Sequence, residues 1–95
     1  MDDVGNLRAR AWIGDAVLGL YARKWILAQV DIKAENRAHE FIAMTANEFL
    51  ACIGEPTKIE AAIGDLYESE GLDAAFKHIE ETILPLYQKQ RKNRR

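Results

Sequence analysis

Apolar residues recur along this chain at helical spacing, and the alternation of apolar and polar residues that is typical of strands does not occur over any length. Two stripes are regular: Ile59, Ala62, Ile63, Leu66 and Tyr67, followed by Leu72, Ala75, Phe76, Ile79, Ile83, Leu86 and Tyr87. The pattern predicts a compact all-α fold of about four to five helices, joined by short connections. We expect helical stretches over residues 7–29, 34–53, 56–70 and 72–87.

The first stretch is apolar almost all the way round between residues 11 and 21, with one acid, Asp15, inside it. A helix of this kind is expected to be buried on more than one side, and Gly14 is expected to bend it. Trp12, Val17 and Leu20 are therefore predicted to line the core or a two-fold interface.

The later stretches carry two further local predictions. Cys52 shares an apolar stripe with Phe41 and Phe49, so we expect it in the core rather than as a nucleophile. Pro85 lies within the last stripe and should kink that helix, since proline removes a backbone donor.

Ninety-five residues with 48% hydrophobic content predict one domain, residues 1–95. The single cysteine excludes a disulfide framework, and neither a signal peptide nor an apolar run of membrane-spanning length is visible. We therefore expect a cytoplasmic protein without a membrane partner. No phosphate-binding loop or dinucleotide motif occurs, so no small-molecule substrate is expected.

Charge is divided unevenly along the chain. Residues 88–95 form a basic tail that holds five of the 13 basic residues, which leaves 8 basic against 15 acidic residues, a net charge of −7, on the rest. An acidic body does not attract nucleic acid by its overall charge, so contacts with a polyanion would need local basic groups or bound metal ions. The tail is expected either to be a frayed, solvated helix end or to contact phosphates.

Two acids, Asp15 and Glu60, stand in apolar helical surroundings, each close to a glycine. Small residues allow helix backbones to approach closely, so the first and third helices can cross near these acids. Two converging carboxylates would suit Mg²⁺, which takes one or two protein carboxylates and completes its shell with water and phosphate oxygens. Capping is the alternative, because Asp15 can cap a helix that starts at Ala16, and Thr57 and Glu60 match a capping box.

Three stretches in sequence order resemble the ribonuclease III family. Trp12–Leu20 is similar to the family's signature helix, with its Gly-Asp-Ala-Val-Leu core, and Ile59–Tyr67 is similar to its second acidic motif. Glu70–Pro85 resembles the family's last helix, including the proline, and Thr45–Ala51 more weakly resembles its Ser-Asn segment.

The resemblance implies a ribonuclease III-like helical domain that acts as a homodimeric, Mg²⁺-dependent endonuclease on double-stranded or structured RNA, with Mn²⁺ as a possible substitute. It implies that Asp15 and Glu60 are the catalytic residues and metal ligands. Phosphate contacts are then expected from Arg23, Lys24, Arg37, Lys89, Arg91 and Lys92.

The chain also departs from the family pattern. Full-length ribonuclease III enzymes have glutamates where this chain has Ala11 and Arg8, and an aspartate in place of Thr57; the compact Mini-ribonuclease III relatives look more similar. The double-stranded-RNA-binding domain is absent, and only 45 positions lead from Asp15 to Glu60. The alternatives are a catalytically silent RNA-binding or assembly subunit of this fold and a purely structural helical domain.

Overall fold

The structure is a computed structural model that describes residues 3–94. It consists of six α-helices and one 3₁₀ helix: α1 (Asp3–Ala28), η1 (Ala34–Asn36), α2 (Arg37–Thr45), α3 (Asn47–Leu50), α4 (Pro56–Glu70), α5 (Leu72–Thr82) and α6 (Leu84–Asn93). No strand occurs within these residues, so the predicted all-α fold is confirmed. Over the same range, no helix has both the length and the apolar character that a membrane span needs.

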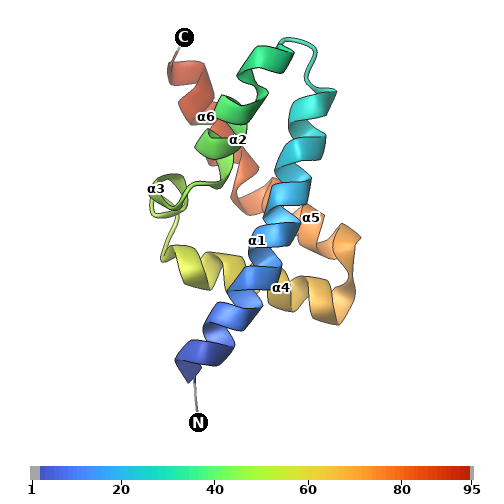
Figure 1. The fold of residues 1–95 in the computed structure, drawn as a ribbon, viewed down its shortest axis with the longest axis vertical. Helices are drawn as coiled ribbons and strands as arrows, with labels where there is room; N and C mark the ends of the chain where they lie inside the picture. Colours follow the sequence, from blue (N-terminus) through green and yellow to red (C-terminus); the bar gives the residue numbers. More distant parts are fainter. Residues whose placement is uncertain (1–2, 95) are drawn as a thin grey trace.

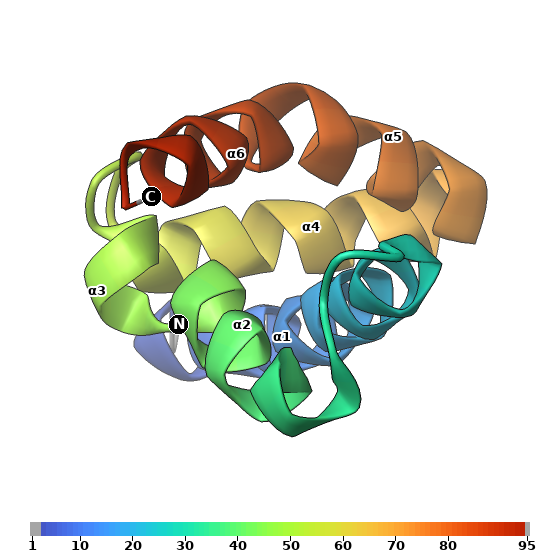
Figure 2. The same ribbon diagram turned by 90° about the horizontal axis from the view of Figure 1, so that it is seen from above.

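Helix α1 runs along the long axis of the molecule and α4 crosses it (Figure 1). Seen from above, α4 lies between α1 with α2 on one side and α5 with α6 on the other (Figure 2). The core fills the space between these layers, and its fully buried side chains include Leu18, Met44, Leu50, Ile63, Ile79, Ile83 and Tyr87. Three aromatic contacts tie α1, α3 and the C-terminal helices together: Tyr21 with Phe76, Trp25 with Tyr87, and Phe49 with Tyr87.

The crossing of α1 and α4 is a contact between backbones. A Cβ atom built on Gly14 would lie 1.6 Å from the Glu60 carbonyl oxygen, and one on Gly64 would lie 2.2 Å from the Arg10 carbonyl oxygen. No side chain fits between the helices at this point, so both positions require glycine for steric reasons. The close crossing predicted from small residues beside the two acids is therefore present.

The first helix differs from its prediction in two ways. It is unbroken from Asp3 to Ala28, so Gly14 does not interrupt it. Val17 is buried with 6% of its surface exposed, but Trp12 is 79% and Leu20 is 43% exposed. These two residues are therefore outside the core of a single copy, because α4 and the other helices cover only one side of α1 (Figure 1), and their place in a two-fold interface stays a prediction.

The second predicted helix is divided into α2 and α3 at Ala46, whose extended backbone (ψ 149°) ends the helical path. The Thr45 hydroxyl donates a hydrogen bond to the Phe41 carbonyl at 2.7 Å and closes the last turn of α2. Because the chain changes direction here, the single apolar stripe does not persist, and Cys52 is exposed rather than in the core. The fourth stretch divides at Ile83 into α5 and α6, and Pro85 lies in the first turn of α6, so the helix is broken rather than kinked at an internal proline.

The basic tail continues α6 as far as Asn93, so a frayed end does not describe it. Glu40 of α2 accepts a hydrogen bond from the Tyr87 hydroxyl, and Arg94 lies 3.2 Å from the same carboxylate. Arg91 pairs with Asp31 at 3.0 Å and lies 3.7 Å from Glu40. These ion pairs join α6 to α2 and to the loop after α1.

Replacing Gly14 by alanine tests the backbone contact. The added methyl group would overlap the Glu60 carbonyl, so we expect a loss of unfolding free energy of about 3 kcal/mol or more, measured by urea denaturation. The matched control is Gly54→Ala, where the nearest atom is a flexible Ile59 carbon at 3.5 Å and the change should stay within about 1 kcal/mol. Equal stabilities of the two variants would contradict the crossing.

Candidate functional site

The glycine crossing brings Asp15 of α1 and Glu60 of α4 together. Asp15 directly follows Gly14, and the Glu60 carbonyl oxygen is the atom that Gly14 faces. Their carboxyl groups lie close enough for a hydrogen bond between them to help raise the pKa of Glu60. The two acids predicted from separate motifs therefore line one hollow.

The electrostatics of the pair follow from this arrangement. Partial burial, the hydrogen bond with Asp15, and the negative charges of Asp15 and Glu55 together raise the pKa of Glu60 from 4.5 to about 7. Two adjacent carboxylates repel each other when both are ionised, so a proton is retained between them near neutral pH. A divalent cation would remove that repulsion by taking the place of the proton.

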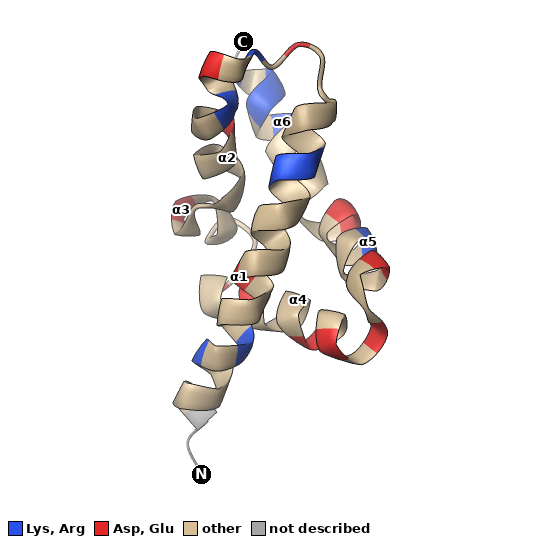
Figure 3. Ribbon diagram, turned by 45° about the vertical axis from the view of Figure 1, so that its right-hand side comes forward, with Lys and Arg blue, Asp and Glu red and all other residues tan. Residues whose placement is uncertain are grey.

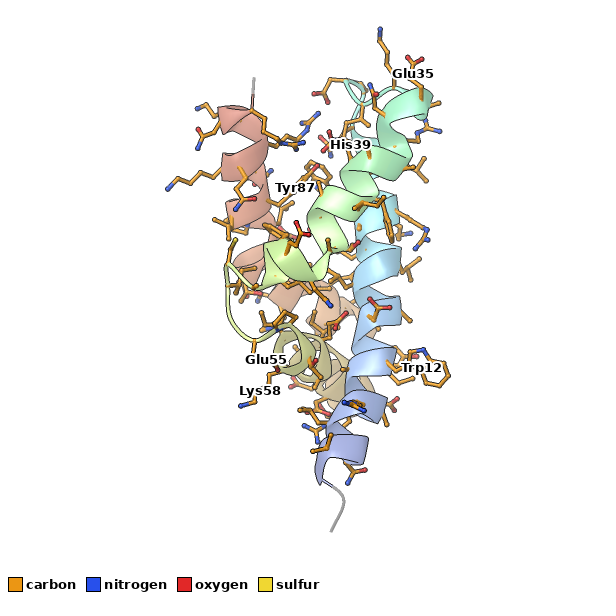
Figure 4. All side chains as sticks on the ribbon, turned by 60° about the vertical axis from the view of Figure 1, so that its left-hand side comes forward. Trp12, Glu35, His39, Glu55, Lys58 and Tyr87 are labelled. Carbon is orange, nitrogen blue, oxygen red and sulfur yellow. The ribbon has the colours of Figure 1, made fainter. Side chains whose placement is uncertain are left out.

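The capping alternatives fail for both acids. Helix α1 continues through Asp15, so no helix begins at Ala16. Helix α4 is capped by Glu55, whose carboxylate accepts hydrogen bonds from the backbone N–H groups of Thr57 and Lys58 at 3.1 and 2.9 Å. Figure 4 shows Glu55 and Lys58 at the start of α4. Glu60 is therefore released from the capping box that the sequence suggested.

The acid pair opens into a surface hollow of about 420 Å³. The hollow is lined by Arg8, Ala11, Trp12, Asp15, Asn47, Thr57 and Glu60. Asn47 and Thr57 were not among the predicted site residues. Asn47 lies in the Thr45–Ala51 stretch and Thr57 lies three positions before Glu60, but neither carried a local signal that it would join this hollow.

The donors in this hollow fit a hydrated Mg²⁺ or Mn²⁺ ion. Two carboxylates, an amide and a hydroxyl are hard oxygen donors, and an open hollow leaves room for water and phosphate oxygens. Within residues 3–94 no group of three or more histidine, cysteine, aspartate or glutamate side chains is placed to hold a metal ion. An ion bound here would therefore depend on Asp15, Glu60 and its own waters.

The basic residues predicted to contact RNA come from three helices, α1, α2 and α6. Figure 3 shows acids mainly on α4 and α5, and basic residues mainly on α1, α2 and α6. Arg23 stacks on the Phe41 ring at 4.2 Å and, with Arg37, borders an apolar hollow between α1 and α2. Arg91 is engaged by its two acids, whereas Lys24, Lys89 and Lys92 are exposed.

Comparisons with known proteins add nothing to this geometry. No family model matches the chain, and no curated protein or solved structure matches it either. The function is therefore argued from the site itself.

Stability should depend on pH through Glu60. Because its pKa is raised to about 7 in the folded protein from 4.5, its stabilising contribution is complete below about pH 4.5 and is lost as the pH rises through 7. Glu60→Gln should thus be more stable than wild type at pH 8, by about 1–2 kcal/mol after allowance for solvent screening, and nearly equal at pH 4.5.

Urea denaturation at both pH values measures this difference. Glu68→Gln, an exposed position on the same helix, serves as the control and should show no such pH-dependent gain. A Glu60→Gln variant no more stable than wild type at pH 8 would show that the two carboxylates do not repel each other.

Proposed function

We propose that this chain is a minimal ribonuclease III-like endonuclease that cleaves double-stranded or structured RNA as a homodimer, with Mg²⁺ or Mn²⁺ as cofactor. The observation that carries the proposal is that Asp15 and Glu60, from two helices, line one open hollow. The resemblance of the two acidic motifs to that family supports it, because both acids come from those motifs.

The polar residues of the hollow have different roles in the proposed hydrolysis of a phosphodiester. A bound divalent ion supplies an activated water and stabilises charge on the phosphate. Asp15 and Glu60 would hold that ion through their ionised carboxylates. Arg8, which has no ion-pair partner within residues 3–94, is placed to bind a non-bridging phosphate oxygen. Asn47 and Thr57 orient the phosphate by hydrogen bonds.

The homodimer is assigned to the uncovered side of α1. Trp12, Leu20 and Leu27 are exposed on this helix, and Figure 4 shows Trp12 pointing away from the body of the molecule. Beside them an apolar hollow of about 470 Å³ opens between α1 and α2. A soluble domain rarely leaves an apolar surface of this kind without a partner.

Symmetry makes a second copy a suitable partner for this face. Two antiparallel α1 helices that cross midway between residues 12 and 27 would place Trp12 against the partner's Leu27. Arg23 and Arg37 then border the interface rather than the RNA.

A catalytically silent RNA-binding or assembly subunit is the second candidate. It is favoured by the small number of acids, since only Asp15 and Glu60 line the hollow, and Arg8 is in a place where full-length enzymes carry an acid. The raised pKa of Glu60 favours the nuclease, because a silent subunit gains nothing from two repelling carboxylates.

Removing one acid should abolish cleavage. With long labelled double-stranded RNA and Mg²⁺, we expect the wild-type protein to cut, and Asp15→Asn and Glu60→Gln to cut at least about 100-fold more slowly, because each loses a ligand. Glu68→Gln should cut at the wild-type rate. RNA binding without cutting by the wild type would decide for the silent subunit.

Introducing a charge on the uncovered face should separate the copies. Wild type is expected to sediment at twice the 10.8 kDa chain mass at micromolar concentration, and Leu27→Glu as a monomer, because a buried unpaired carboxylate opposes association. Tyr67→Ser, which changes an exposed ring on α4, is the matched control and should remain dimeric. A monomeric wild type would exclude a mechanism in which two copies cut two strands.

A further inference from the structure

A second hollow of about 300 Å³ lies between the C-terminal part of α1 and α6, away from the acid pair. It is lined by Trp25, Gln29, Gln88, Arg91 and Lys92. Residue 25 lies in the last turn of α1 and residue 29 directly follows that helix, and residues 88, 91 and 92 share one face of α6. Two helices therefore present an indole, two amides and two cations to the same small space.

The walls of this hollow are held in place. The Trp25 ring packs edge-on against Tyr87, with centroids 5.6 Å apart and planes at 89°. The Gln29 side-chain amide donates to the Trp25 carbonyl at 3.1 Å, which leaves its side-chain oxygen as an acceptor. Arg91 is fixed by Asp31 at 3.0 Å and Glu40 at 3.7 Å. A ligand would thus meet groups that are already ordered.

The chemistry of the lining matches a nucleotide. An indole offers a stacking surface for a base, and side-chain amides can bond the polar edge of a base that is not paired. Gln88 and Lys92 are exposed and have no hydrogen-bond or ion-pair partner within residues 3–94. Lys92 lines the hollow, so its ammonium group can approach a phosphate bound there.

Charge limits what this hollow can bind. Arg91 is already compensated by two carboxylates, so Lys92 contributes the main free positive charge. One free cation can neutralise the charge of a single phosphate, but not that of a duplex backbone. For single-stranded nucleic acid, one neutralised phosphate corresponds to a slope of about −0.7 in log K against log salt.

We propose that this hollow binds one unpaired nucleotide of a single-stranded RNA segment, with the base against Trp25 and the amides and the phosphate on Lys92. The inference rests on the proposed function, and extends it: the preferred RNA carries a single-stranded extension beside its paired region. An acidic peptide or a free nucleotide are the competing occupants, and the experiment separates them.

The test uses the Asp15→Asn protein, so that RNA is bound without being cut. The probe is a uridine hexanucleotide, and the readout is the indole N–H signal of Trp25 in ¹H–¹⁵N spectra, told apart from that of Trp12 by a Trp12→Phe sample. We expect the Trp25 signal to shift on titration, with a salt slope of about −0.7. Lys92→Ala should weaken binding about fivefold or more and Gln88→Ala about threefold, whereas Lys89→Ala, on the same helix but outside the hollow, should change it less than about twofold.

Several results would overturn the inference. They are an unmoved Trp25 signal, equal losses for Lys92→Ala and Lys89→Ala, an equal shift with a blunt RNA duplex, and equally tight binding of uridine monophosphate or of a hexaglutamate peptide. Because the readout does not involve cleavage, a failed nuclease assay with an intact Trp25 shift would reject the nuclease and keep the nucleotide site. Cleavage without a Trp25 shift would do the reverse.

Discussion

At the crossing of α1 and α4 two backbones touch, with Gly14 and Gly64 facing each other's helices and no side chain between them. This contact decides where the adjoining side chains lie. Asp15, next to Gly14, and Glu60, one turn before Gly64, are thereby brought to the same hollow. The fold thus holds two like charges together, and the raised pKa of Glu60 is the electrostatic consequence. The close packing of the two helices and the repulsion between the two carboxylates oppose each other here. A bound cation would reduce that repulsion and so stabilise the fold.

Much of the fold followed from the sequence. The regular stripes of residues 59–67 and 72–87 predicted two helices, of which the first is α4 and the second is divided at Ile83 into α5 and α6. The break at Ala46 was not predictable from periodicity, because alanine is a good helix former and the change of direction serves to bury Phe49 and Leu50. The exposure of Trp12 was missed for a related reason: an apolar residue in a sequence does not reveal whether the chain itself covers it.

The candidate site was predictable in part. The two acids and the glycines beside them were recognisable in the sequence. Their local patterns, however, were as compatible with helix capping as with two carboxylates that meet between helices. The structure distinguishes these two possibilities, because Glu55 caps α4 and Glu60 is therefore free to approach Asp15. Asn47 joins the hollow only because α3 turns back toward α1, a tertiary effect without a local signal. The prediction of a frayed tail was wrong because Asp31 and Glu40, far away in sequence, form ion pairs with Arg91 and Arg94.

The most direct test of the acid pair is a ¹³C NMR titration of the Glu60 side-chain carboxyl, with and without Mg²⁺. We expect a midpoint near pH 7 in the absence of metal and a shift to below about 5 in saturating Mg²⁺, since the cation replaces the retained proton. A midpoint near 4.5 that does not respond to Mg²⁺ would contradict both the close approach of the two carboxylates and the metal site built on it.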